Sequence, residues 1–238
     1  MGKSAAGAKV TINGNPVSVS YEGLFAFGFA YDQKMPVRVA ATYPGGMTEV
    51  RDIMPVARQY EVQNVTGLPQ EMVTPTPEEE ARIQREHARL AQVRATDSDE
   101  TWFSEPFDWP APGIISGLFG SQRILNGKPS APHFGVDIAA AEGVPVRAPA
   151  GARVLMAEEF YLEGNFTLLD HGHGVFTGYL HQSKVLIKPG DRVSRGQQIG
   201  CVGKTGRATG PHLHWGMNLF QLRLDPSRST RTPAPPKA

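Results

Sequence analysis

Five residues between positions 133 and 214 have types and spacings suited to metal-assisted hydrolysis. They form an HxxxD in HFGVD, a lone histidine in YLH and an HxH in PHLHW, and are His133, Asp137, His181, His212 and His214. Two imidazole nitrogens and one carboxylate oxygen make the open ligand set of a hydrolytic zinc, which leaves one coordination position for water. Bound there, water ionises with a pKa of about 7. The residue types therefore predict a catalytic Zn²⁺ site, and the absence of thiolates from the set argues against a structural zinc of the cysteine type.

The spacings indicate how these side chains converge. Positions i and i+4 share a face in a helix and in a strand, so His133 and Asp137 point the same way in either. The β-branched Val136 and the preceding Pro132 favour strand or loop here. If residues 212–217 form a strand, both imidazoles of the HxH project to one side. One ring can then hold the metal while the other faces the reacting atoms.

The other histidines are expected to have ordinary roles. His171 and His173 lie in DHGHG, where a Gly-rich turn between two strand-like runs accounts for polar residues. His87 lies in a charged segment and is predicted to be solvated.

A family resemblance covers about half of the chain. The segments HFGVDIA, GYLHQS, VSRGQQIG and VGKTGRATGPHLHW follow one another in the order and spacing of the LytM-type, lysostaphin-like zinc endopeptidases, from about residue 113 to about 225. The resemblance implies that Zn²⁺ is held by His133, Asp137 and His214. It also implies that His181 and His212 are the catalytic pair, which steadies the water and the developing oxyanion and passes a proton to the leaving amine.

The resemblance implies hydrolysis of peptide bonds in the stems or cross-links of bacterial peptidoglycan, in the periplasm or the extracellular envelope. The junction GLPQEMVTPTPEEEARIQRE resembles a link found in Gram-negative envelope proteins, which favours the bond between D-alanine and diaminopimelate. A catalytically silent wall-binding or amidase-activating partner, with its cleft blocked by the N-terminal β-domain, is the alternative. A β-rich binding module, suggested by the glycines of KPGDRVSRGQQIG, leaves the five clustered residues unexplained.

Composition excludes other classes of function. The net charge of +1 over 238 residues gives no electrostatic reason to expect nucleic acid as a partner. No run approaches the roughly 18 apolar residues of a membrane span. We expect that an export signal has been removed from the chain, and that another cell-wall enzyme is a possible partner.

The single cysteine, Cys201, lies in an apolar strand-like run and is predicted to be a small buried thiol.

The elements that carry the site are predicted to be mainly β. Short runs at 9–12, 17–21, 37–41 and 60–65 indicate a small antiparallel β-domain over 9–74, preceded by a disordered leader at 1–8. A connecting helix begins after Thr76, with Pro77 in its first turn and Glu79 completing a capping box. It runs to about Arg94 within a helix-and-linker segment over 75–110.

The peptidase domain is predicted over 111–226 as antiparallel sheets, followed by a disordered tail at 227–238. Its strands are expected at 144–149, 153–158, 166–170, 175–181, 184–187 and 212–218. The aromatic cluster ahead of this domain is favoured as a plug between domains over a peptide-binding patch, and comprises Trp102, Phe103, Phe107 and Trp109.

Three further residues have two possible roles each. Tyr179 either lines the cleft or packs within a sheet. Arg123 and Asn126 either contact the substrate and close over the zinc, or belong to a loop with a turn at Asn126 and Gly127, which is the simpler interpretation.

Overall fold

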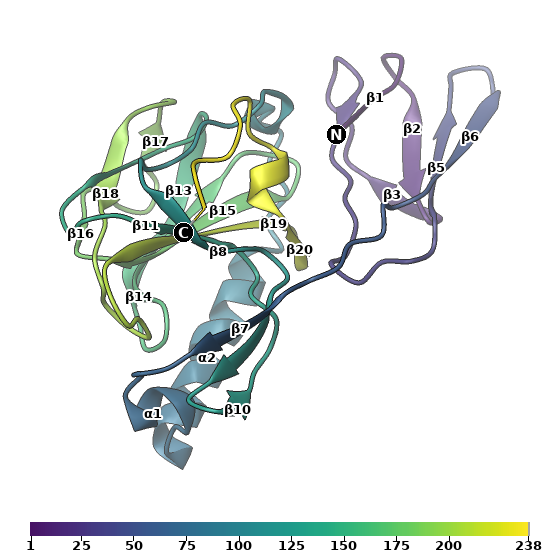
Figure 1. Cartoon of the computed structure of the whole chain (residues 1–238). Helices are drawn as coiled ribbons and strands as arrows, with labels where there is room; N and C mark the ends of the chain where they lie inside the picture. Colours follow the sequence, from purple (N-terminus) through teal and green to yellow (C-terminus); the bar gives the residue numbers. More distant parts are fainter. Residues whose placement is uncertain (238) are drawn as a thin grey trace.

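The fold is built around one large antiparallel sheet (Figure 1). The structure is a computed structural model that describes residues 1–237. The sheet has the order β17-β13-β14-β15-β19-β11-β8, with β20 paired to β19. Its strands are β8 (Ile114–Gly117), β11 (Val136–Ala139), β13 (Ala152–Phe160), β14 (Gly164–Asp170), β15 (Val175–Gln182), β17 (Arg192–Val193), β19 (His212–Leu219) and β20 (Leu222–Leu224). The mainly β fold with an antiparallel C-terminal part is confirmed.

Strand alternation separates the core from the site. In β19, Leu213, Trp215 and Met217 are buried in the main core. Because successive side chains of a strand point to opposite faces, His212 and His214 lie together on the other face. The core is closed by a second small sheet, ordered β12-β18-β16, from β12 (Pro145–Arg147), β16 (Lys184–Val185) and β18 (Gln198–Cys201).

The helix α2 (Pro77–Val93) packs on the face that is turned away from this core. Its capping box forms as predicted, with the Thr76 side chain accepting from the Glu79 backbone and the Glu79 side chain accepting from the Thr76 backbone. Leu90 is its most buried residue and joins an apolar cluster with Met156, Phe160, Phe166, Leu168 and Phe176. The short helices are α1 (Gln70–Val73), η1 (Trp102–Ser104) and η2 (Pro226–Arg228).

A third sheet corrects one prediction. The strand β7 (Val62–Val65) pairs in parallel with β9 (Gln122–Leu125), which also pairs with β10 (Lys128–Pro129). The run at 60–65 was expected within the N-terminal β-domain, but its partner lies about 60 positions further along the chain. Local patterning predicts that a strand exists and carries no information about so distant a partner.

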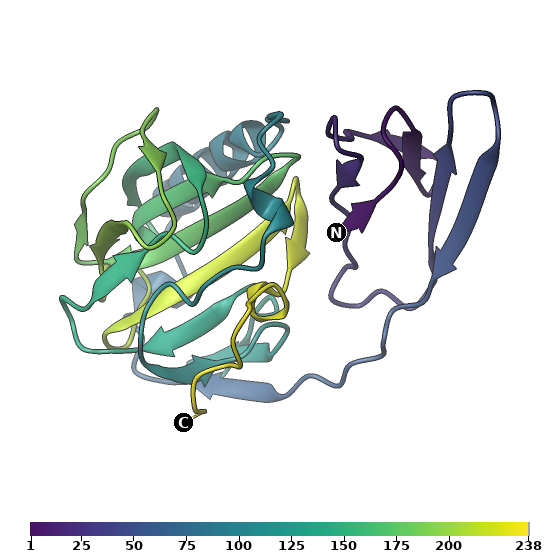
Figure 2. The same ribbon diagram turned by 90° about the horizontal axis from the view of Figure 1, so that it is seen from above.

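The N-terminal strands form a separate four-stranded sheet, ordered β3-β2-β5-β6. They are β2 (Lys9–Ile12), β3 (Asn15–Val17), β5 (Val37–Thr42) and β6 (Thr48–Ile53). Figures 1 and 2 show this sheet to one side of the rest of the chain. The strand expected at 17–21 ends at Val17, and β6 was not predicted.

Residues near both ends of the chain are paired where disorder was predicted, and residue 238 of the predicted tail lies outside the described residues. At the start, β1 (Gly2–Lys3) pairs with β4 (Leu24–Phe25), and Ala8 is buried. At the end, Thr230 bridges to Phe107 and Lys237 bridges to Ile115. A polar, proline-rich segment has few apolar side chains to bury, and this composition predicts disorder. Its backbone N–H and C=O groups can still pair along an available strand edge, and for this reason the prediction was wrong. Over residues 1–237, the helices are too short or too polar to cross a membrane.

Candidate metal centre

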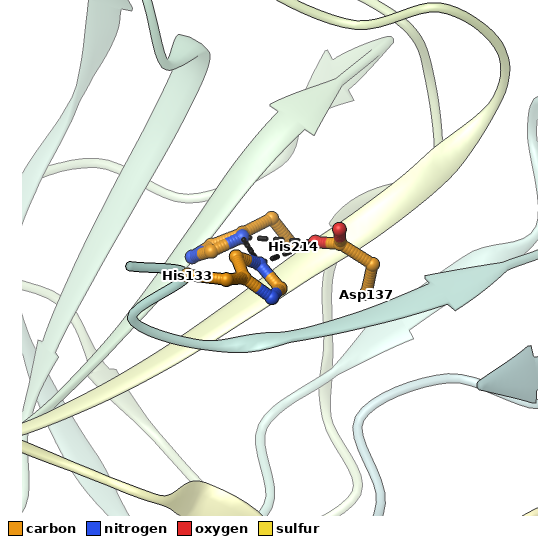
Figure 3. Close-up of side chains that lie close together, drawn as sticks. All are labelled: His133, Asp137 and His214. Atoms are coloured by element: carbon orange, nitrogen blue, oxygen red, sulfur yellow. Dashed lines mark hydrogen bonds and ion pairs between the residues drawn. The ribbon is translucent and has the colours of Figure 1, made fainter. Parts of the chain in front are cut away.

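Three predicted residues converge on one point (Figure 3). His214 lies directly opposite Asp137 across the β11–β19 pair, and His133 comes from the loop that leads into β11. His214 Nδ1 is 2.9 Å from His133 Nε2 and 2.9 Å from Asp137 Oδ1. His133 Nε2 is 3.1 Å from the same carboxylate oxygen. The structure therefore brings together the two imidazoles and the carboxylate that the sequence assigned to the metal.

The surroundings of Asp137 favour the ionised form of its carboxylate. Burial alone raises the pKa of Asp137, but the adjacent His133 and His214 more than offset this effect and hold that pKa well below its usual range. His133 Nδ1 is 3.0 Å from the carbonyl oxygen of Leu118. A ring that donates to a carbonyl from Nδ1 keeps the lone pair of Nε2 turned toward the other two donors.

Two glycines give these side chains room. A Cβ at Gly135, inside the HxxxD, would lie 2.4 Å from Nε2 of His214. A Cβ at Gly117 would lie 2.5 Å from Oδ2 of Asp137. Glycine at these two positions therefore avoids a steric clash between the backbone and the donor group.

The remaining two imidazoles lie beside this group. The ring centroids of His181 and His212 are 4.7 Å apart. The Nδ1 atoms lie 2.8 Å from the Thr205 carbonyl oxygen and 2.9 Å from the Gly210 carbonyl oxygen, respectively. Since each Nδ1–H is used by the backbone, each Nε2 is left with a lone pair. His212 Nε2 lies 3.9 Å from Asp137 Oδ1.

His181 is held as a neutral ring. Burial, together with the neighbouring His212 and His214, lowers the pKa of His181 to about 3. At neutral pH the ring is therefore unprotonated, and its free Nε2 can accept a hydrogen bond from a water molecule.

The structure also decides between the two interpretations of Arg123 and Asn126. The Arg123 guanidinium pairs with Oδ2 of Asp137, the oxygen turned away from the two imidazoles, and its Nε donates to Gln63 Oε1 at 3.3 Å. Asn126 has a positive φ of 46° and bonds the backbone of Leu68, so the predicted turn is confirmed there.

An open cavity of about 460 Å³ adjoins the group. Its walls come from β7 with the loop that follows it and from the 207–211 loop before β19, and its lining includes Asp137, His212 and Arg123. Arg207 also lines it, and the sequence analysis missed this residue. The only available signal was its place in TGRATG, immediately before the HxH.

Of the three histidines outside this group, two are buried and one is exposed. His171 and His173 do lie at the turn between β14 and β15, but both are buried. His171 bonds the Gly151 carbonyl oxygen and the Thr177 hydroxyl at 2.8 and 2.7 Å. His87 is exposed, as predicted, and lies 3.0 Å from a carboxylate oxygen of Glu163.

The other predicted side chains fall in the core or at its edge. Phe103 and Phe107 are buried in the main core, and Trp109 packs edge-on against Trp215 at 5.5 Å, so these aromatic side chains belong to the core that carries β19 and do not line the cavity. Tyr179 is fully buried within the sheet and does not line the cavity. Cys201 is a free thiol in β18 and is half-buried, less covered than expected.

Comparison with known proteins identifies the family. Residues 131–226 match the family model described as Peptidase family M23. The chain carries a peptidase family M23 domain. The predicted LytM-type resemblance is thereby confirmed, and the family is zinc-dependent, in agreement with the predicted cofactor.

Two curated relatives come from Vibrio cholerae. The peptidoglycan DD-endopeptidase ShyA is 48% identical over 102 residues, which is 42% of this chain and 24% of ShyA. The peptidoglycan DD-endopeptidase ShyB is 42% identical over 133 residues, which is 56% of this chain and 31% of ShyB. The chain thus spans about a quarter to a third of the length of these relatives.

A solved structure from Pseudomonas aeruginosa that is assigned to peptidase M23 shares the wider fold. It superposes with a TM-score of 0.69 at 27% identity, over 95% of this chain and 88% of its own. The similarity therefore extends beyond the M23 domain to the N-terminal strands and α2.

Proposed function

We propose that this chain is a zinc-dependent endopeptidase that hydrolyses peptide bonds in peptidoglycan cross-links, between D-alanine and diaminopimelate. The observation that carries the proposal is the convergence of donor atoms from His133, Asp137 and His214 beside two further oriented imidazoles. The names of the relatives, peptidoglycan DD-endopeptidases, support the choice of substrate. A place in the periplasm or outer envelope follows from that substrate, and a further cell-wall enzyme as partner stays a prediction.

The donor group fits zinc. Its three atoms lie 2.9 to 3.1 Å from one another. Ligands at about 2.0–2.1 Å around a tetrahedral ion are separated by about 3.3 Å, so small side-chain movements suffice. We assign His133, Asp137 and His214 as the ligands. When bound, the ion polarises the scissile carbonyl and lowers the pKa of a water molecule.

The protein supplies the proton transfers. His181 and His212 each keep Nδ1–H on a backbone carbonyl and face the site with Nε2. In our proposal one Nε2 takes a proton from the attacking water and later delivers it to the leaving amine. The other takes up a proton from solvent on Nε2 and donates a hydrogen bond from there to the developing oxyanion. Because both rings are already oriented by the backbone, little rearrangement is needed.

The silent-partner alternative is less well supported. It required the N-terminal β-domain to block the cleft, whereas the most N-terminal residue lining the cavity is Gln63, in β7. All five predicted residues have the types that the chemistry needs.

The test is digestion of purified, cross-linked peptidoglycan by the zinc-loaded chain, with products resolved by liquid chromatography and mass spectrometry. We expect the wild type to convert dimeric muropeptides to monomers and His181→Ala to bind zinc without turnover. His133→Ala and His214→Ala should lose zinc, because two ligands hold the ion poorly. Wild-type zinc content in both ligand variants would remove the ligand assignment, and uncut dimers in the presence of bound zinc would remove the proposed activity.

A further inference from the structure

The cavity beside the donor group has an uneven distribution of charge. Its lining includes one carboxylate, Asp137, and two guanidiniums, Arg123 and Arg207. Asp137 and Arg123 form an ion pair with each other. The positive charge of Arg207 is therefore not balanced by the lining, and a bound Zn²⁺ adds to the positive potential.

Arg207 is not used by the rest of the fold. It is half-buried, and within the described residues 1–237 its side chain has no hydrogen-bond partner and no ion pair. Glu163 is the carboxylate whose charge raises the pKa of Arg207, but one of its oxygens bonds His87 and it forms no ion pair with Arg207. Burial lowers the pKa of Arg207 and Glu163 partly offsets this, but a guanidinium stays charged at neutral pH. Keeping a partly desolvated cation without a partner costs stability, unless a ligand supplies the anion.

The backbone of Arg207 is fixed relative to the catalytic pair. Its N–H donates to the carbonyl oxygen of Leu162 at 2.8 Å. Two positions earlier, the carbonyl oxygen of Thr205 accepts from His181 Nδ1. The same short loop therefore orients a catalytic imidazole and carries the free guanidinium into the cavity that contains His212.

We propose that Arg207 binds a carboxylate of the substrate next to the scissile bond. The inference rests on the proposed function, in which the leaving amine belongs to diaminopimelate. The carbon that bears this amine also bears a carboxylate, which is free in the cross-link. A guanidinium and a carboxylate form paired, charge-assisted hydrogen bonds of defined geometry. Arg207 would thus select an acidic residue on the amine side of the bond and hold it in register with His181 and His212.

The experiment compares two synthetic cross-linked muropeptide dimers, one with this carboxylate free and one with it converted to the amide. Wild type, Arg207→Gln and Arg207→Lys are assayed for kcat/KM on both, with zinc content measured for each. Arg85→Gln is the matched control, because Arg85 is exposed on α2, away from the cavity lining.

We expect the wild type and Arg85→Gln to prefer the free carboxylate by about tenfold to hundredfold, the range of a charge-assisted hydrogen bond. Arg207→Gln should lose most of that preference at unchanged zinc content, and Arg207→Lys should retain part of it. Full discrimination by zinc-loaded Arg207→Gln, or none by the wild type, overturns the inference.

Calorimetric binding of both dimers to zinc-loaded His181→Ala, with and without Arg207→Gln, separates the two proposals. If the wild type cuts neither dimer but binding favours the free carboxylate through Arg207, the proposed activity fails and the carboxylate site stands. If the wild type cuts both dimers equally and binding shows no preference, the activity stands and the carboxylate site fails. Absence of binding by either dimer also removes the carboxylate site.

Discussion

Gly135 lies between two of the proposed ligands and leaves space for the third. A side chain there would begin 2.4 Å from the His214 ring, closer than nonbonded atoms approach. The HFGVD motif thus combines two functions in five residues, since it supplies His133 and Asp137 and also makes room for a ligand that arrives about 80 positions later.

Gly135→Ala is expected to push His214 out of the donor group and to weaken zinc binding by about tenfold to hundredfold, the usual effect of disturbing the support of a metal ligand. Competition with a chelator measures the affinity. Gly210→Ala is the matched control, because a Cβ at Gly210 meets nothing within 4 Å. Equal affinities in the two variants would show that His214 does not need the space.

The burial of His171 predicts how the stability of the protein changes in acid. The ring is fully buried, and burial lowers its pKa from 6.5 to about 4. As the pH falls, the unfolded chain takes up this proton near pH 6.5, whereas the folded chain takes it up only near pH 4. The stabilisation is therefore complete above pH 6.5 and is lost as the pH falls toward 4, by up to about 3 kcal/mol.

Denaturant unfolding of the wild type and His171→Gln between pH 7.5 and 4.5 tests this linkage. The variant is expected to be less stable at neutral pH, because it leaves the Gly151 carbonyl or the Thr177 hydroxyl poorly bonded. Its stability should nevertheless fall less steeply with acid than that of the wild type. Parallel pH profiles would assign the acid sensitivity to other groups.

Among the secondary-structure elements, the turn between β13 and β14 connects α2 to the catalytic loops. On the helix side, Glu86 accepts from the Tyr161 backbone at 2.9 Å and His87 bonds Glu163. On the site side, the Glu163 carbonyl oxygen accepts from the His181 backbone at 2.8 Å. Gly164 completes the connection, because the space beside it is occupied by Thr205, whose carbonyl oxygen orients the His181 ring.

Gly164→Ala is therefore expected to reduce turnover with little loss of zinc. A Cβ there would lie 2.3 Å from Thr205 Oγ1, so the 205–207 loop must shift and His181 with it. We expect kcat to fall by about tenfold or more, since catalytic geometry tolerates little displacement. Gly190→Ala has a similar positive φ with open space around it and controls for backbone strain. Equal kcat values in the two variants would exclude a role for the contact with Thr205.

For the molecule as a whole, the N-terminal segment contributes to the site through one strand. The β2, β3, β5 and β6 sheet lies to one side, whereas β7 pairs with the strand that carries Arg123 and lines the cavity. Residues ahead of β7 also pack on the peptidase, as Tyr31 does against Phe134 at 5.4 Å between ring centroids. Catalysis and stability should therefore respond differently to shortening of the chain.

Two shortened chains, lacking residues 1–56 and 1–66, test this division. Both should unfold at a lower temperature than the full chain, because both lose the packing around Tyr31. Only the second loses β7, and its kcat/KM should be lower by about tenfold or more, equivalent to about 1.4 kcal/mol of transition-state stabilisation. Equal activity in the two chains would show that β7 is dispensable for the cleft.

The residue types and their local spacings determined the donor group. An HxxxD, a lone histidine and an HxH specify which atoms can bind zinc, and strand alternation fixes which side chains of the HxH share a face. The capping box and most of the C-terminal strands follow from local patterns in the same way. These features could be predicted because each depends on residues a few positions apart.

Only the tertiary structure decided that β7 joins β9, that Arg123 pairs with Asp137, that Arg207 lines the cavity and that His171 is buried. It also ordered the two ends of the chain through backbone pairing. Each of these features depends on contacts between segments far apart in sequence. The periodicity of a segment records which of its faces is apolar, and it does not record which distant strand, carboxylate or core will meet that face.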